Sequence, residues 1–137
     1  LQLSNAEFTS VLDFIRETRK ENRIHLSYGC EGFLGNYEQE VRDHFYTCHA
    51  GINVASVLAD GSISACPSIR SNFNQGNIYT DNFWQVWNDR FKPFRDRNWA
   101  HTGACPDCEM WRYCEGNGMH LHDDEGKLMV CHYGRIE

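Results

Sequence analysis

Positive charge, proline and long hydrophobic runs are all scarce in this sequence, and each shortage excludes a class of protein. Its 137 residues carry 13 Lys and Arg against 19 Asp and Glu, a formal net charge of −6 that repels the phosphate backbone of nucleic acids. Only three prolines are present, so there is no Pro-rich, low-complexity linker. No run is apolar for long enough to anchor the chain in a membrane. We therefore expect no nucleic-acid partner and no membrane insertion.

A secretory signal is absent too, because the first residues, Leu1–Glu7, lack a basic and an apolar segment. Seven cysteines, an odd number, then disfavour a framework of disulfides. We expect a cytoplasmic, reducing compartment in which thiolates hold metal. The missing initiator methionine indicates a fragment or a processed chain. No catalytic triad, phosphate loop or pair of catalytic carboxylates stands out, so no catalytic residue is predicted.

The cysteines with the most regular spacing lie between Cys105 and Cys131. Two residues separate Cys105 from Cys108, so a tight turn can aim both sulfurs at one point, and Cys114 and Cys131 complete four thiolates. Independent buried cysteines have no reason to show this spacing, so the pattern predicts a metal site. Zinc and a four-iron four-sulfur cluster both accept four thiolates in tetrahedral directions, and the spacing leaves the choice between them open.

A second candidate set, with looser spacing, comprises Cys30, Cys48 and Cys66. Three thiolates leave one position for a substrate, a water molecule, a histidine or, in a vestigial site, nothing. The histidines considered for that position are His49, His120 and His122. On a strand, His120 and His122 would share a face, although each one taken singly is more simply a solvent-facing or hydrogen-bonded side chain.

Local patterns predict an α+β protein. Ser4 and Glu7 form a capping box that starts a helix ending near Asn22, with apolar residues at helical spacing. Those residues are Phe8, Val11, Leu12 and Ile15. Residues 24–28 are expected to form a strand, so that residues 1–29 make one helix–strand step. A loop with one short helical turn around Glu38–His44 should follow.

Two hairpins and a helix are predicted in the rest of the chain. The Asp60-Gly61 dipeptide between residues 52–58 and 62–66 is typical of a tight hairpin turn, which would bring Cys48 and Cys66 near each other. A strand is expected near residues 77–79, and then Thr80 or Asp81 should cap a helix that Pro93 ends or kinks. Its apolar positions are Phe83, Val86, Trp87, Phe91 and Phe94. Residues 119–122 and 127–131 should pair as the second hairpin.

The order of the cysteines resembles that of the SPASM domain, the C-terminal auxiliary iron–sulfur cluster domain of radical SAM enzymes that modify peptides and proteins. The resemblance covers about residues 30–137 and follows the pattern Cys48-x12-Gly61-x4-Cys66, Cys105-x2-Cys108-x5-Cys114 and Cys131. It implies a small cysteine-rich metal-binding domain with β-hairpins and a few helices over residues 30–137. Residues 1–29 would be the last helix and strand of a partial TIM barrel.

By position, the resemblance implies two clusters of the four-iron four-sulfur type. The ligands of the distal cluster would be Cys105, Cys108, Cys114 and Cys131, and those of the proximal one Cys48 and Cys66, with Cys30 as a further candidate. The family's next ligand falls four positions after Cys114, where this chain has Gly118, so His120 or His122 is a candidate extra ligand. The runs 28–33 and 114–120 are similar to a subgroup linked to lipoprotein-associated systems.

Our leading hypothesis is an auxiliary-cluster domain of a radical SAM maturase that acts on a peptide or protein and serves electron transfer, substrate binding or both. The Cys-x3-Cys-x2-Cys motif of the SAM cluster is absent, so the chain alone should not cleave SAM. SAM would bind the missing barrel of the same chain. The alternative, in a different functional class, is a structural zinc-binding protein-interaction module, and zinc can also substitute for iron at thiolate sites.

Overall fold

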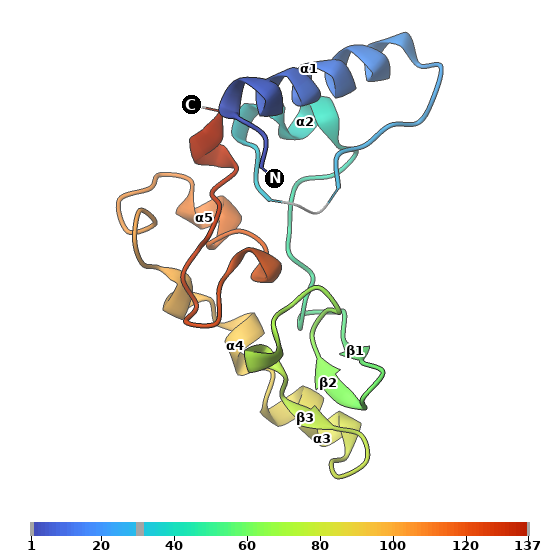
Figure 1. The fold of residues 1–137 in the computed structure, drawn as a ribbon, viewed down its shortest axis with the longest axis vertical. Helices are drawn as coiled ribbons and strands as arrows, with labels where there is room; N and C mark the ends of the chain where they lie inside the picture. Colours follow the sequence, from blue (N-terminus) through green and yellow to red (C-terminus); the bar gives the residue numbers. More distant parts are fainter. Residues whose placement is uncertain (1, 30–31, 137) are drawn as a thin grey trace. The chain divides into compact units, whose positions relative to one another are not determined.

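The computed structural model describes residues 2–29 and 32–136, which divide into two compact units (Figure 1). The first unit comprises residues 1–47 and 130–137, and the second comprises residues 48–129. Helices and a three-stranded antiparallel sheet together confirm the predicted α+β class. Each unit is described by itself below.

The first unit is built on helix α1 (Asn5–Glu21), which begins and ends where the sequence predicts. The amide of Glu7 donates to the Ser4 hydroxyl at 3.3 Å, and the amide of Ser4 donates to the Glu7 carboxylate at 2.8 Å, so the predicted capping box forms. Asn22 closes the helix in the left-handed conformation, at φ 51°. The buried residues of α1 are Phe8, Leu12 and Ile15, while Val11 faces solvent.

The strand predicted over residues 24–28 does not form, and that prediction was wrong. Its backbone groups find other partners instead of a neighbouring strand. The Arg19 guanidinium donates to the carbonyl of Leu26 at 2.5 Å, and the amide of Tyr28 donates to the carbonyl of Val41 at 2.8 Å. Ile24 stays 61% exposed, so the apolar alternation that suggested a half-buried strand buries little here.

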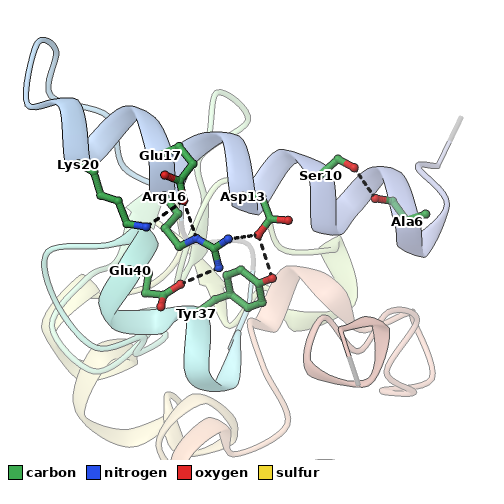
Figure 2. A network of polar contacts seen from close by, with 8 residues as sticks. All are labelled: Ala6, Ser10, Asp13, Arg16, Glu17, Lys20, Tyr37 and Glu40. Atoms are coloured by element: carbon green, nitrogen blue, oxygen red, sulfur yellow. Dashed lines mark hydrogen bonds and ion pairs between the residues drawn. The ribbon is translucent and has the colours of Figure 1, made fainter.

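A 3₁₀ turn, η1 (Gly35–Tyr37), leads into α2 (Glu38–Val41), which confirms a short helical turn in this loop. Figure 2 shows how polar side chains connect α1 to this segment. Arg16 pairs with Asp13 at 2.9 Å on its own helix and with Glu40 at 3.3 Å on α2, and the Tyr37 hydroxyl donates to Asp13 at 3.1 Å. A last 3₁₀ turn, η5 (Tyr133–Arg135), also belongs to this unit.

The second unit contains the predicted hairpin, with strands shorter than expected. Strand β1 (Ser56–Val57) pairs antiparallel with β2 (Ser62–Ser64), and β3 (Gly76–Asn77) pairs antiparallel with the other edge of β2. Gly61, at φ 84°, makes the turn between the first two strands, and a Cβ there would lie 2.5 Å from the Tyr79 ring. Strand β3 begins one residue earlier than the strand predicted near residues 77–79.

Helix α3 (Phe83–Asp89) is capped by Asn82, so the predicted caps, Thr80 and Asp81, were wrong. The Asn82 side chain accepts the amide of Gln85 at 3.1 Å. Asp81 is engaged elsewhere, since its carboxylate accepts the amide of Asn77 at 2.9 Å. Pro93 lies in the first turn of a separate helix, α4 (Lys92–Arg95), which confirms the predicted break. The fully buried core residues from this region are Val86, Phe91 and Phe94.

The second predicted hairpin is reduced to one antiparallel bridge between His122 and Leu128. Residues 119–121 form a 3₁₀ turn, η4 (Met119–Leu121), rather than a strand, because the amide of Leu121 turns back to the carbonyl of Gly118 at 3.0 Å. The predicted turn does form: the Asp123 carboxylate accepts the amides of Glu125 and Lys127 at 3.1 and 2.7 Å. The remaining helical turns of the unit are η2 (Ser71–Phe73), η3 (Asn98–Ala100) and α5 (Trp111–Cys114).

Candidate metal centre

The segment from Cys105 to Cys114, called the knuckle below, is a series of tight turns that begin at the cysteines. The amide of Cys108 donates to the carbonyl of Cys105 at 3.2 Å, and the amide of Trp111 donates to the carbonyl of Cys108 at 3.1 Å. Cys105 is 9% exposed and Cys108 is half-buried. Such consecutive turns are the backbone form that two cysteines separated by two residues need in order to face one point.

Cys114 ends helix α5, and the chain leaves it through three left-handed residues in a row. Glu115, Gly116 and Asn117 have φ values of 46°, 81° and 67°, and the amide of Asn117 donates to the carbonyl of Cys114 at 2.9 Å. Only glycine fits at position 116, because a Cβ there would lie 2.9 Å from the Cβ of Ala100. This turn folds the chain after the knuckle against the segment that precedes it.

Cys131 belongs to the first unit, whereas Cys105, Cys108 and Cys114 belong to the second. Its side chain is exposed, and its Sγ atom accepts the amide of Gly134 at 3.4 Å. Amide donors of this kind stabilise the charge of a thiolate and tune the potential of a cluster that it ligates. The local turn at residues 131–134 therefore suits a metal-binding thiolate.

Cys48 and Cys66 flank the hairpin and both pack, half-buried, against one hydrophobic cluster of the second unit. The buried members of that cluster are Ala50, Ile63, Ala65, Ile69, Val86, Phe91, Phe94 and Met119. The carbonyl of Cys66 accepts the amide of Ile69 at 3.2 Å and the hydroxyl of Ser64 at 3.3 Å. Cys30, the third member of the predicted proximal set, lies outside the described residues.

The three candidate histidines have different surroundings. His122 is fully buried, and its Nδ1 atom lies 3.2 Å from the carbonyl of Gly118. Donation from Nδ1 to this carbonyl leaves Nε2 with a lone pair, and Nε2 is buried without a hydrogen-bond partner among the described residues. Burial, followed by the charge of Arg97, lowers the pKa of His122 to about 4. His49 is exposed, and His120 lies half-buried on η4. Because residues 119–121 form a 3₁₀ turn and not a strand, His120 and His122 do not share a strand face as predicted.

In the comparison with protein families, residues 48–109 match the SPASM model, described as an iron–sulfur cluster-binding domain. The SPASM segment includes the hairpin with Cys48 and Cys66 and the start of the knuckle with Cys105 and Cys108. No curated protein and no solved structure matches the chain. The match confirms the resemblance to a SPASM domain over these residues.

Arg97, within the SPASM segment, is a residue that the sequence did not single out. Its side chain is only 8% exposed, and its Nη2 donates to the carbonyl of Asn117 at 2.8 Å. The guanidinium carbon lies 5.5 Å from the centre of the Trp99 ring, and His122 contacts the same ring at 5.0 Å between centroids. Neither spacing nor periodicity distinguishes a buried arginine from the other twelve Lys and Arg of the chain.

Within residues 2–29 and 32–136, no three His, Cys, Asp or Glu side chains are grouped so that they could hold a metal ion. The thiolates of a four-iron cluster bind different iron atoms, so they need not meet around one ion as zinc ligands must. The chemistry of the donor set, thiolates with one orphaned imidazole nitrogen, fits an iron–sulfur cluster. In the same part of the chain, no helix has the length and apolar character needed to cross a bilayer.

Proposed function

We propose that this chain is the auxiliary iron–sulfur cluster domain of a radical SAM maturase that modifies a peptide or protein in the cytoplasm. The observation that carries the proposal is the SPASM match over residues 48–109. That segment contains two pairs of cysteines: Cys48 and Cys66 flank the hairpin, and Cys105 and Cys108 lie at the start of the knuckle.

Cys105, Cys108, Cys114 and Cys131 are the proposed ligands of the distal cluster. The turns of the knuckle and the amide donated to the Cys131 sulfur support this assignment. The proximal cluster would be held by Cys48 and Cys66, with Cys30 as the proposed third ligand. When bound, such clusters supply one-electron transfer and, at an iron without a protein ligand, a point of attachment for substrate.

His122 is the better of the two candidate extra ligands. Its neutral imidazole is oriented by the carbonyl of Gly118, and its Nε2 lone pair lacks a partner among the described residues. Gly118 itself has no side chain to offer at the position where the resemblance implies a ligand. A histidine four residues further on would therefore replace that missing side chain.

Radical formation is not proposed for this chain alone, because it lacks the Cys-x3-Cys-x2-Cys motif. A partial TIM barrel, of which residues 1–29 would be the last part, is the proposed site of SAM binding. A peptide or protein substrate would be modified there, with the SPASM segment passing electrons or holding the substrate.

A structural zinc-binding interaction module is the second candidate function. The observation that favours it is the knuckle, because paired turns at Cys105 and Cys108 suit a zinc ion as well as a cluster. Zinc taken up during aerobic handling would not count for this alternative, since thiolate sites bind it opportunistically.

Anaerobic reconstitution followed by iron, sulfide and zinc analysis tests the proposal. We expect equal amounts of iron and sulfide, a broad iron–sulfur absorption, and loss of the distal cluster's share of the iron in Cys105→Ala. His44→Ala is the control, because His44 is exposed, is not a candidate ligand and should leave the iron content unchanged. One tightly held zinc ion per chain after anaerobic preparation, without sulfide or iron–sulfur absorption, would contradict the proposal.

A further inference from the structure

Arg97 is a buried cation without a counter-ion in an acidic protein. It is 8% exposed, no carboxylate pairs with it in the part of the chain that the structure describes, and its Nε atom is buried without a hydrogen-bond partner there. Asp96, its neighbour in sequence, is exposed and accepts the amide of Asn98 at 3.1 Å. A buried charge is costly unless an opposite charge and hydrogen bonds compensate it.

The other buried arginine of the chain shows what such compensation looks like. Arg42, 4% exposed, lies 2.7 Å from the Glu38 carboxylate and donates to the carbonyl of Gly32 at 2.5 Å. Among the described residues, Arg97 has the carbonyl of Asn117 and the face of the Trp99 ring but no carboxylate, and the unpartnered Nε is common to both arginines. The carbonyl and the ring stabilise the Arg97 charge in part, but no anion among the described residues balances it.

The position of Arg97 links it to the knuckle. Asn117, which accepts from Arg97, donates its own amide to the carbonyl of Cys114. The backbone carbonyl of Arg97 accepts the amide of Ala100, and Ala100 packs against Gly116 in the same turn. The guanidinium is therefore fixed at the turn by which the chain leaves Cys114, a proposed cluster ligand.

We propose that Arg97 is the buried counter-charge of the cluster bound at the knuckle and that it raises the reduction potential of that cluster. This inference rests on the proposed function. A four-iron cluster with four thiolates carries a net negative charge, which grows by one on reduction, so a nearby cation stabilises the reduced form more than the oxidised form. The Nε–H of Arg97, which has no partner among the described residues, is the donor available for a cluster sulfur.

Redox titration of the anaerobically reconstituted 137-residue chain, followed by electron paramagnetic resonance, tests the inference. Arg97→Gln removes the charge, and we expect it to shift the midpoint potential of the knuckle cluster to more negative values. Arg97→Lys keeps the charge and should stay close to the wild-type potential. Arg95→Gln is the matched control, because Arg95 also stacks on a tryptophan, at 4.7 Å from the Trp87 ring centre, but is exposed. It should leave the potential unchanged.

Several results would overturn the inference, and they differ from a failure of the proposed function. A cluster-loaded Arg97→Gln with the wild-type potential, or an equal shift in Arg95→Gln, would show that the buried charge does not act on the cluster. If Arg97→Gln fails to load, Arg97→Lys decides: loading and potential close to wild type support the counter-charge, whereas failure of both variants assigns Arg97 a purely structural role. Absence of any iron–sulfur signal in the wild type would overturn the proposed function and this inference together.

Discussion

The two units of the protein differ in how they balance the charge of a buried arginine. In the first unit, both oxygens of the buried Glu38 carboxylate are used: one accepts from Arg42 and the amide of Leu34, and the other accepts the amide of Tyr46. In the second unit, no carboxylate of the described residues pairs with Arg97, although Nε of each arginine is buried without a hydrogen-bond partner there. Because a buried charge is normally paired, the proposed cluster would supply the anion that the second unit lacks.

The largest expected effect comes from removing a knuckle thiolate. Cys108→Ala should lose the distal metal and, with it, the cooperative unfolding of the second unit, because metal-binding free energies on the order of 10 kcal/mol become folding free energy. Metal analysis combined with hydrogen exchange would measure both effects. Exchange protection of residues 48–129 at the wild-type level in the metal-free variant would contradict the claim that the second unit needs its ligand.

Removing the buried carboxylate of the first unit should destabilise that unit without affecting metal. Glu38→Gln leaves Arg42 buried without its anion, which typically costs about 3–5 kcal/mol. Denaturant unfolding checks the change, with Glu40→Gln as the control because its ion pair with Arg16, at 3.3 Å, lies on the surface and should contribute less than about 1 kcal/mol. A fall in iron content of Glu38→Gln equal to that of Cys108→Ala would break the distinction between the units.

His122 should make the second unit sensitive to acid. Its pKa is about 4 in the folded protein against 6.5 for an ordinary histidine, so below pH 6.5 the unfolded chain binds a proton that the folded chain does not. Stability is therefore lost as pH falls from about 6.5 towards 4, by about 2 kcal/mol at pH 5.

Unfolding of the metal-loaded protein at pH 7.5 and pH 5, compared at equal measured iron content, gives this effect as the difference between wild type and His122→Gln. Protonation of thiolates is common to both proteins and cancels in that difference. His44→Gln serves as the control, because His44 is exposed and is not a candidate ligand. An identical pH dependence in wild type and His122→Gln would show that the imidazole is not held neutral.

The smallest expected effect is a difference between the two proposed clusters in the rate at which they release metal. The proximal centre should release metal several-fold faster than the distal one under a chelator, since Gly118 offers no side chain where the resemblance implies a ligand. Time-resolved spectra that separate the two clusters would measure this. Equal rates, or faster loss at the knuckle, would contradict the assignment of three cysteines to the proximal site.

Features set by neighbouring residues could be predicted from the sequence. The capping box of α1, the Asp60-Gly61 turn and the knuckle spacing each depend on a few consecutive residues, and all three form. The strand at residues 24–28 and the second hairpin needed a distant partner strand. Side chains and turns satisfied their backbone groups instead, as at the Arg19 contact with Leu26.

The candidate site was predictable in its ligand types and not in its surroundings. Cysteine spacing predicts which thiolates would share a cluster, because that spacing is a property of the chain, and this grouping stays a prediction. The burial of Arg97 and the isolated Nε2 of His122 arise from packing around Trp99, which no periodicity reveals. Asn82 was missed as a helix cap because Thr80 and Asp81, two equally good capping residues, precede it.

Mössbauer spectroscopy of the chain reconstituted anaerobically with isotopically enriched iron tests most directly whether the second unit is completed by an iron–sulfur cluster. We expect the spectrum of four-iron four-sulfur clusters in the wild type and loss of the knuckle component in Cys105→Ala and Cys108→Ala. A spectrum of adventitious mononuclear iron alone, unchanged by either substitution, would contradict this expectation.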